Sequence, residues 1–285
     1  MIQDITPHIL KNQYTKVDAG KDDYLIFFKG REVLCRIDAM EKAHIPKFKD
    51  VEKWNPNIYE DDIFLFSVDE RPYFLVSHLK IAEDENFRYI DIKVFLESSK
   101  RHKGFATVTA FQLSNWYQNH RFCGKCGHEL VHADKERMLH CAHCGNMEYP
   151  KLAPAVIVGI RNGEYLLMTK YRGRISRYYA LVAGFAEIGE TIEETVRREV
   201  KEEVGLEIKN ISYYKSQPWG LTDTLLFGFY ADVDGDDTIT LDEEELELGK
   251  WIHYTDIDST HTHYSLTSEM IQHFRSEKIL NKENK

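Results

Sequence analysis

Carboxylates at helical spacing are the residues of this chain best suited to chemistry. Glu199 and Glu203 are four positions apart in a segment with a helical pattern, so they would project from one face, one turn apart. Like charges at this spacing repel by roughly 0.2–0.5 kcal/mol. A hard dication with oxygen ligands, such as Mg²⁺ or Mn²⁺, would relieve that repulsion. The alternative is a solvated, charge-laced helix without a site, which is common.

The ends of this helix are marked in the sequence. Thr191 with Glu194 forms a capping box at the start, and Gly205 is placed to end the helix in a left-handed conformation. Arg198 and Glu202 form a second pair four apart on an adjacent face, where the arginine can orient a carboxylate.

Two Cys-x-x-Cys pairs indicate a structural zinc site. Cys123 and Cys126 are followed, after fourteen residues, by Cys141 and Cys144, and such paired knuckles place four thiolates around one tetrahedral Zn²⁺. Four sulfurs close the coordination shell, so the zinc would be structural. We therefore expect the histidines of this segment not to ligate it. We also favour a folding staple between two domains over nucleic-acid binding, because the charge of the segment is mixed.

The composition indicates a cytosolic globular protein. The 285 residues are 42% hydrophobic and 29% charged, and the formal net charge of -10 disfavours a general nucleic-acid binder. No stretch approaches 18 apolar residues and no secretory signal is visible at the start, so no membrane association is expected. Clustered cysteines in a reducing compartment favour metal binding over disulfides.

The elements that must position these residues divide into three segments. Residues 1–118 are predicted to form a mixed α/β domain, with hairpins at 24–37 and 63–76 and a helix at 107–119. Residues 119–150 form the four-cysteine ribbon. Residues 151–280 form the third domain, with strands at 155–160, 165–168, 211–216, 225–231 and 251–254 and a final helix at about 265–280.

The spacing of the acidic segment resembles that of Nudix hydrolases. Gly184, Glu190, Arg198, Glu199, Glu202, Glu203 and Gly205 match the Nudix box G-x5-E-x7-R-E-U-x-E-E-x-G-U, in which U is aliphatic, without a gap or substitution. The resemblance implies an α+β fold class, with an α/β/α Nudix sandwich behind the ribbon and the N-terminal domain. It also implies hydrolysis of a nucleoside diphosphate linked to another moiety.

The same resemblance implies roles for the residues of the box. Glu199 and Glu203 correspond to ligands of the catalytic Mg²⁺ or Mn²⁺, and Glu202 to a further ligand or the water-activating carboxylate. Arg198 corresponds to the orienting partner of Glu202, and Glu190 supports the loop.

Three further features resemble the zinc-ribbon NAD(H) pyrophosphatase branch, in which NAD(H) is split into AMP and nicotinamide mononucleotide. These are the adjacent ribbon, the Tyr149–Pro154 segment, and Ser216-Gln217-Pro218-Trp219 after the box. The resemblance implies that Glu245 is an extra metal ligand. It implies substrate contacts from the following residues: Glu136, Tyr149, Phe185, Gln217, Pro218, Trp219 and Thr224. Tyr149 as hinge packing, Phe185 as core and Glu136 as a surface acid are the alternatives.

One departure affects the expected substrate. The family signature Ser-Gln-Pro-Trp-Pro-Phe-Pro-x-Ser continues here as Gly220-Leu221-Thr222-Asp223-Thr224, which keeps the final hydroxyl but loses the proline-aromatic middle. NAD(H) remains the first expectation, with ADP-ribose or another ADP-linked metabolite as the alternative.

Partners and rival functions follow from the same resemblance. It implies activity on the 5′ end of NAD-capped RNA and a homodimer. A non-catalytic Nudix-like nucleotide sensor is disfavoured because every acid of the box is present and no basic helix-turn-helix follows. A zinc-ribbon RNA-binding module that carries an inactive Nudix fold is the third alternative.

Overall fold

The described part of the chain forms two compact units. The computed structural model describes residues 1–60, 62–81, 84, 86–173, 178–258 and 264–283. The first unit contains residues 2–151 and 220–223, and the second contains Met1, 152–219 and 224–285. No helix in the described ranges is long and apolar enough to span a bilayer. The ribbon thus groups with the N-terminal segment, and the boundaries at 118 and 150 stay a prediction.

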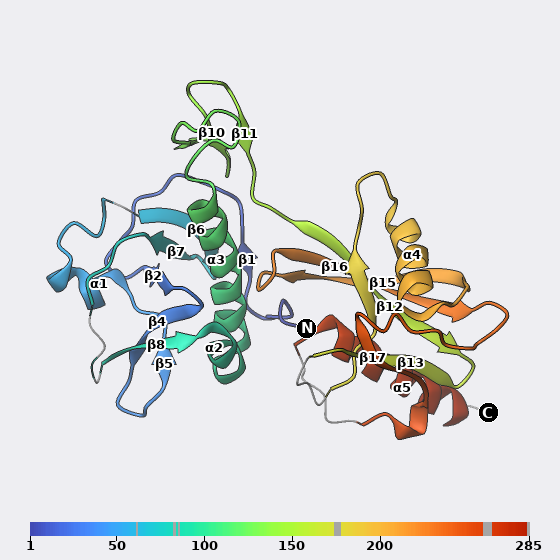
Figure 1. Cartoon of the computed structure of the whole chain (residues 1–285). Helices are drawn as coiled ribbons and strands as arrows, with labels where there is room; N and C mark the ends of the chain where they lie inside the picture. Colours follow the sequence, from blue (N-terminus) through green and yellow to red (C-terminus); the bar gives the residue numbers. More distant parts are fainter. Residues whose placement is uncertain (61, 82–83, 85, 174–177, 259–263, 284–285) are drawn as a thin grey trace. The chain divides into compact units, whose positions relative to one another are not determined.

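The N-terminal segment is built on two four-stranded sheets (Figure 1). One has the order β1 (Leu10–Lys11), β6 (Asp62–Val68), β7 (Arg71–Val76), β2 (Tyr24–Ile26). The other joins β3 (Phe28–Lys29), β4 (Glu32–Ile37) and β5 (Ala43–His44), with β8 (Phe87–Asp91) also on β4. The helices are α1 (Phe48–Val51), η1 (Glu52–Trp54), α2 (Ile92–Ser98) and α3 (Arg101–Asn119).

The two predicted hairpins are confirmed only in part. The second, β6–β7, is antiparallel and turns at Asp69–Glu70, both with positive φ. The first hairpin is formed only by β3 and β4. The strand predicted to begin at Tyr24 is interrupted after Ile26, and its first part, β2, pairs in parallel with β7 in the other sheet. The predicted helix at 107–119 begins earlier, at Arg101.

The ribbon is a small three-stranded sheet carrying two loops. Its strands are β9 (Val131–His132), β10 (Leu139–His140) and β11 (Met147–Glu148), in the order β11-β10-β9. Each knuckle closes on a glycine in the left-handed region, Gly127 with φ +77° and Gly145 with φ +73°. The N–H of each glycine donates to the carbonyl of the first cysteine in its own pair, Cys123 or Cys141.

The second unit is one six-stranded mixed sheet between helices (Figure 1). Its order is β15 (Ile208–Trp219), β16 (Thr224–Val233), β12 (Ala153–Asn162), β13 (Tyr165–Tyr171), β17 (Leu246–His253), with β14 (Val182–Phe185) also paired to β12. The helices are α4 (Ile192–Val204), η2 (Tyr254–Asp256) and α5 (Leu266–Glu283). Every strand predicted here and the final helix are confirmed, although β17 ends at His253, since Tyr254 begins η2, and the helix begins at Leu266.

The two faces of this sheet are covered by different helices because β12 alternates its side chains. Val156 and Val158 join one buried cluster with the α4 stripe of Val196, Val200 and Val204. Ile157 points the other way and joins a second cluster with Met270, Ile271 and Phe274 of α5. This three-layer arrangement confirms the predicted α/β/α sandwich and fixes α4 rigidly by its apolar stripe.

Candidate active site

The acidic helix α4 has both predicted end signals. The hydroxyl of Thr191 accepts from the N–H of Glu194, and the Glu194 carboxylate accepts from the N–H of Thr191. At the other end Gly205 has φ +72° and donates its N–H to the carbonyl of Lys201. The capping box and the glycine stop are therefore confirmed, and they fix the turn from which the carboxylates project.

Glu199 and Glu203 lie on one face of α4 and are buried. Their exposed fractions are 9% and 2%, and carboxylates are rarely buried to this extent unless they are paired. Both oxygens of Glu203 lack a hydrogen-bond partner of normal geometry among the described residues. Burial raises the pKa of Glu203 to about 8. The backbone of Ala183 offsets part of the shift, and the negative charges of Glu199, Glu245 and Asp242 add to it.

Gly184 gives the Glu199 carboxylate the space it occupies. A Cβ on Gly184 would lie 2.0 Å from Cδ of Glu199 and 2.1–2.2 Å from its two oxygens. Strand β14, which carries Gly184, pairs with β12 at Val156, so the backbone cannot move aside without breaking the ladder. The first glycine of the box is thus required by close approach, because no side chain fits between β14 and Glu199.

Arg198 is the hub of the polar contacts around these acids. Its Nε donates to Glu190 at 2.6 Å, and its Nη1 donates to Glu199 at 2.7 Å and Glu202 at 2.9 Å. Its Nη2 donates to the carbonyl of Phe185 at 2.8 Å. One planar guanidinium thereby orients three carboxylates and the last carbonyl of β14, which an ammonium group could not do in the same geometry.

Glu190 ties the loop before the helix to that hub. Its carboxylate also accepts from the N–H of Glu187 and the hydroxyl of Thr195. The hydrogen bond from Arg198, followed by the one from the Glu187 backbone, lowers the pKa of Glu190 to about 2. Glu190 is therefore ionised and supports the loop, which is the role that the family resemblance implies for it.

The loop before β17 adds further acids. Glu245 is exposed, and its charge raises the pKa of both Glu199 and Glu203, so it faces them from outside the box. Asp242 also faces Glu203, and its N–H donates to the carbonyl of Glu203 at 2.9 Å. Sequence reasoning missed Asp242. The run Asp242-Glu243-Glu244-Glu245 was a visible signal, but nothing in it distinguished the residue that turns inward.

These residues fit a hard dication. A buried carboxylate without partners is strongly unfavourable unless its charge is compensated, and Glu203 has two such oxygens beside the Glu199 carboxylate. The donors are all carboxylate oxygens, which Mg²⁺ and Mn²⁺ prefer. Glu202, whose side chain is 58% exposed, lies at the edge of this group with one oxygen on Arg198.

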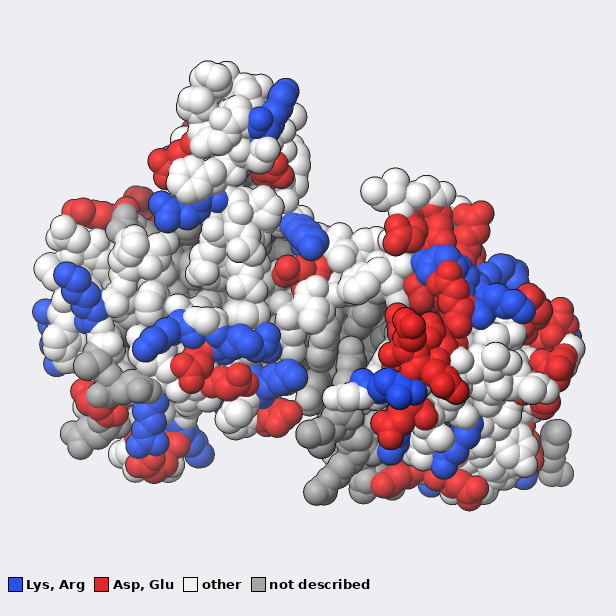
Figure 2. All heavy atoms as spheres, viewed as in Figure 1, with Lys and Arg blue, Asp and Glu red and all other residues white. Residues whose placement is uncertain are grey.

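Acidic side chains dominate the surface above this helix. Figure 2 shows them gathered in the region that α4 occupies in Figure 1. Glu187, Glu193, Glu194 and Glu202 are among the exposed acids of this segment. A field of this sign repels a pyrophosphate, so a negatively charged substrate would need bound dications to approach.

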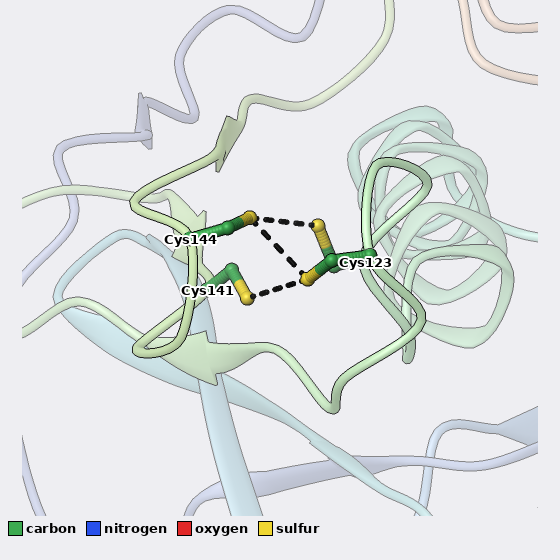
Figure 3. A group of neighbouring side chains, drawn as sticks. Cys123, Cys141 and Cys144 are labelled. Atoms are coloured by element: carbon green, nitrogen blue, oxygen red, sulfur yellow. Dashed lines mark hydrogen bonds between the residues drawn. The ribbon is translucent and has the colours of Figure 1, made fainter.

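The four cysteines converge in the ribbon as predicted (Figure 3). Their sulfur atoms lie 3.3–3.6 Å apart in the pairs Cys123–Cys144, Cys126–Cys141 and Cys126–Cys144. A tetrahedron with Zn–S bonds of about 2.3 Å places its sulfurs roughly 3.8 Å apart, so the four thiolates fit structural Zn²⁺. The N–H of Cys144 is the largest cause that lowers the pKa of the Cys141 thiol to about 7, which favours the metal-binding thiolate.

Gln217, the first predicted substrate contact after the box, points into the interior of the protein. Gln217 is fully buried, and its amide donates to the carbonyl of Tyr264 and accepts from the N–H of Leu266, both at 2.8 Å. Its amide therefore braces the start of α5. Pro218 and Trp219 are half-buried, and Thr224 is buried opposite Trp219. The Trp219 ring lies parallel to that of Tyr264, with centroids 6.2 Å apart.

The remaining predicted contacts are exposed. Phe185 is 55% exposed on β14, directly after Gly184, and is not core. In the first unit Tyr149 is 52% exposed and its hydroxyl donates to Glu136 at 3.4 Å, so these two residues are together. The structure thus brings the box acids, Arg198 and Glu245 into one group in the second unit, and Glu136 and Tyr149 into a pair in the first.

Two family models match parts of the chain, one of them that of the NUDIX class. The NUDIX domain family matches residues 151–274, and the NADH pyrophosphatase zinc ribbon domain matches residues 118–149. A solved NUDIX hydrolase from Nitrosomonas europaea is similar over 55% of this chain and 92% of its own, with a TM-score of 0.45 and 21% identity.

Curated relatives place the chain within that class. The NAD-capped RNA hydrolase NudC of Pectobacterium atrosepticum is 45% identical over 50% of this chain and 55% of its own. That of Haemophilus influenzae strain PittGG is 35% identical over 65% of both chains, and that of strain KW20/Rd 34% identical over 76% and 74%. The chain belongs to the NudC family of Nudix hydrolases. In the first two of these alignments it spans about 55 and 65% of the relative's length.

Proposed function

We propose that the protein hydrolyses the pyrophosphate bond of NAD(H) to AMP and nicotinamide mononucleotide, and acts likewise on the NAD cap of RNA. The observation that carries the proposal is the buried pair Glu199 and Glu203 at the centre of a complete Nudix box, in which Arg198 contacts Glu199 but both oxygens of Glu203 lack a partner among the described residues. The names of the relatives, NAD-capped RNA hydrolases, support the substrate class. Only cleavage of the pyrophosphate bond gives AMP together with nicotinamide mononucleotide, so these two products identify the bond that is cut.

The proposed catalytic ion is Mg²⁺ or Mn²⁺, held by Glu199, Glu203, Glu202 and Glu245. When bound, it would supply positive charge to the phosphate oxygens and favour deprotonation of a nearby water. Glu199 and Glu203 would hold their positions because Arg198 and the α4 packing fix them before the substrate arrives. This preorganisation is what makes electrostatic stabilisation effective.

Glu202 is the proposed acceptor of the proton from the attacking water. Arg198 holds Glu202 Oε2 at 2.9 Å, and the Glu202 side chain is 58% exposed, so water can reach it. Because Arg198 is shared with Glu199 and Glu190, the position of Glu202 depends on the whole hub. The neighbouring carboxylates titrate as a group, so the proton that leaves water belongs to that group and not to one isolated residue.

The substrate contacts are proposed at Phe185, Tyr149, Glu136, Pro218, Trp219, Thr224 and Gln217. Phe185 and Tyr149 present exposed aromatic surface on which a flat ring can stack. Gln217 is buried and would support its neighbours Pro218 and Trp219 through its hydrogen bonds with the Tyr264 carbonyl and the Leu266 N–H. Hydrolysis of ADP-ribose is the second candidate, because the Gly220–Thr224 segment departs from the signature of the NAD(H) branch.

Glu203→Gln tests the reaction. Products of NADH, NAD⁺, ADP-ribose and a short NAD-capped RNA are measured with Mg²⁺ or Mn²⁺, with Glu193→Gln as the matched exposed control on the same helix. We expect AMP and nicotinamide mononucleotide from NAD(H), and a loss of about 10²–10³-fold in the Glu203 variant only. Cleavage of ADP-ribose alone would show that ADP-ribose, and not NAD(H), is the substrate. Cleavage of none of the four compounds would favour a non-catalytic nucleotide sensor.

We also propose a cytoplasmic homodimer. Four clustered cysteines with a metal-site geometry suit a reducing compartment. The dimer is what the family resemblance implies, and the molar mass of the purified protein by light scattering tests it. A mass of one 33.5 kDa chain at micromolar concentration would contradict the dimer.

A further inference from the structure

Two histidines on the ribbon lie together although the predicted zinc shell leaves them out. His128 follows Cys126 by two residues in the first knuckle, and His143 stands between Cys141 and Cys144 in the second. Their imidazole rings are parallel within 6°, with centroids 3.9 Å apart. Both side chains are exposed, so neither packing nor burial requires this pairing.

The fold of the knuckles brings them together. Gly127 reverses the first knuckle, and Cys123 then donates its N–H to the carbonyl of His128 at 2.7 Å. His128 is exposed directly after this turn, and His143 is exposed within the second knuckle. One potential metal ligand from each loop therefore stands outside the four-sulfur group.

The sulfur of Cys126 connects the two groups. A ring nitrogen of His128, a ring nitrogen of His143 and Cys126 Sγ all lie within 4.8 Å of one another. Cys126 Sγ is also 3.5 Å from Cys141 Sγ and 3.3 Å from Cys144 Sγ, within the four-sulfur group shown in Figure 3. A thiolate has lone pairs for two metal ions. It can belong to the inner shell and still face the histidines.

We propose that the ribbon carries a second, exposed site for a late first-row divalent ion such as Zn²⁺, formed by His128, His143 and the shared thiolate of Cys126. Two imidazoles and one thiolate are the ligand types that Zn²⁺ selects. Zn–N bonds of about 2.0–2.1 Å place the two ring nitrogens of a tetrahedral site roughly 3.4 Å apart, a separation that exposed side chains reach by rotation. The fourth position faces solvent, so this ion exchanges more readily than the inner zinc.

The test counts ions on the full chain under conditions that occupy the oxygen-ligated Nudix site. Protein carrying its inner zinc is dialysed against Zn²⁺ in excess Mg²⁺, and bound zinc is measured for the wild type, His128→Ala, His143→Ala and the control His78→Ala. His78 is exposed and lies outside the ribbon. We expect about one additional zinc per chain in the wild type and the control, and its loss in both ribbon variants. No additional ion, or one that survives both substitutions, overturns the proposal.

A spectroscopic measurement separates the shared thiolate from a site made by histidine alone. Co²⁺ added to the zinc-loaded wild type would give a thiolate-to-cobalt charge-transfer band if Cys126 is a ligand. The band would be absent in His128→Ala, whose inner zinc content remains one per chain. Binding of Co²⁺ by the wild type without that band would overturn the shared-thiolate site. Neither measurement depends on the hydrolase activity.

Discussion

Gly184 and Glu199 are related by the absence of a side chain: a Cβ on Gly184 would meet the carboxylate carbon of Glu199 at 2.0 Å. The glycine belongs to β14 and the glutamate to α4, so the contact joins the sheet to the acidic helix. The position of a proposed metal ligand is thereby set by the backbone of a strand.

Gly184→Ala is expected to displace Glu199 and lower kcat of NADH hydrolysis by about 10²-fold, because a shift of about 1 Å in a reacting group has that effect. The matched control is Gly124→Ala, where a Cβ has no atom within 4 Å and φ is not positive. Steady-state kinetics of both variants check the prediction. An alanine variant at 184 with wild-type kcat would contradict it.

Arg198→Lys is expected to lower kcat/KM by about 10–100-fold, the usual effect of losing a group that orients metal ligands. The ammonium group cannot reach Glu190, Glu199, Glu202 and the Phe185 carbonyl together, so the loop over residues 185–190 should also exchange its amide hydrogens faster. Arg197→Lys is the control, because Arg197 donates to the Ile208 carbonyl outside the site. Equal kinetics for the two variants would show that the hub is dispensable.

Gln217→Ala is expected to destabilise the fold by about 1–3 kcal/mol, because it leaves the Tyr264 carbonyl and the buried N–H of Leu266 without their amide partner. Chemical unfolding followed by circular dichroism measures this, with the exposed Gln118→Ala as control. If Gln217 served only to contact the substrate, KM would rise while the free energy of unfolding stayed unchanged.

Asp62→Asn is expected to stabilise the protein at neutral pH. Burial, with the nearby charge of Asp18, raises the pKa of Asp62 from 3.8 to about 6. A carboxyl with a raised folded-state pKa favours folding below its unfolded pKa, and this contribution is lost as pH rises from about 4 to 6. Because the group is half exposed, we expect about 1 kcal/mol at pH 7.

The difference between Asp62→Asn and the wild type should therefore vanish below pH 4. Thermal unfolding of both proteins between pH 4 and 8 measures it. A variant that is less stable than the wild type at pH 7 would show that the Asp62 carboxylate has a favourable partner.

Local signals made the second unit predictable. The capping box at Thr191, the stop at Gly205 and the apolar strand at 155–160 are encoded by neighbours in sequence, and all are confirmed. The parallel pairing of β2 with β7 was not predictable in the same way. Residues 24–28 read as one strand, and only a distant partner decides that Ile26 and Phe28 enter different sheets.

Side-chain direction limited what could be predicted of the site. The spacing of Glu199 and Glu203 determines that they share a helix face, so their proximity followed from the sequence. Gln217 follows two register shifts in β15, so alternation counted from the start of the strand no longer tells which way its side chain points. Asp242 contributes to the site through a loop conformation, for which the sequence carries no periodic signal.

Because both oxygens of Glu203 lack partners in the described part of the chain, the stability of the Nudix domain would depend on the concentration of the ion that binds there. An ion that binds only the folded chain adds RT ln(1 + [L]/Kd) to its stability, about 1.4 kcal/mol for each tenfold rise in concentration above Kd. Starvation for the ion would thus reduce the amount of intact enzyme as well as the rate of each molecule. Turnover of the protein and supply of the ion would then be linked through one buried side chain.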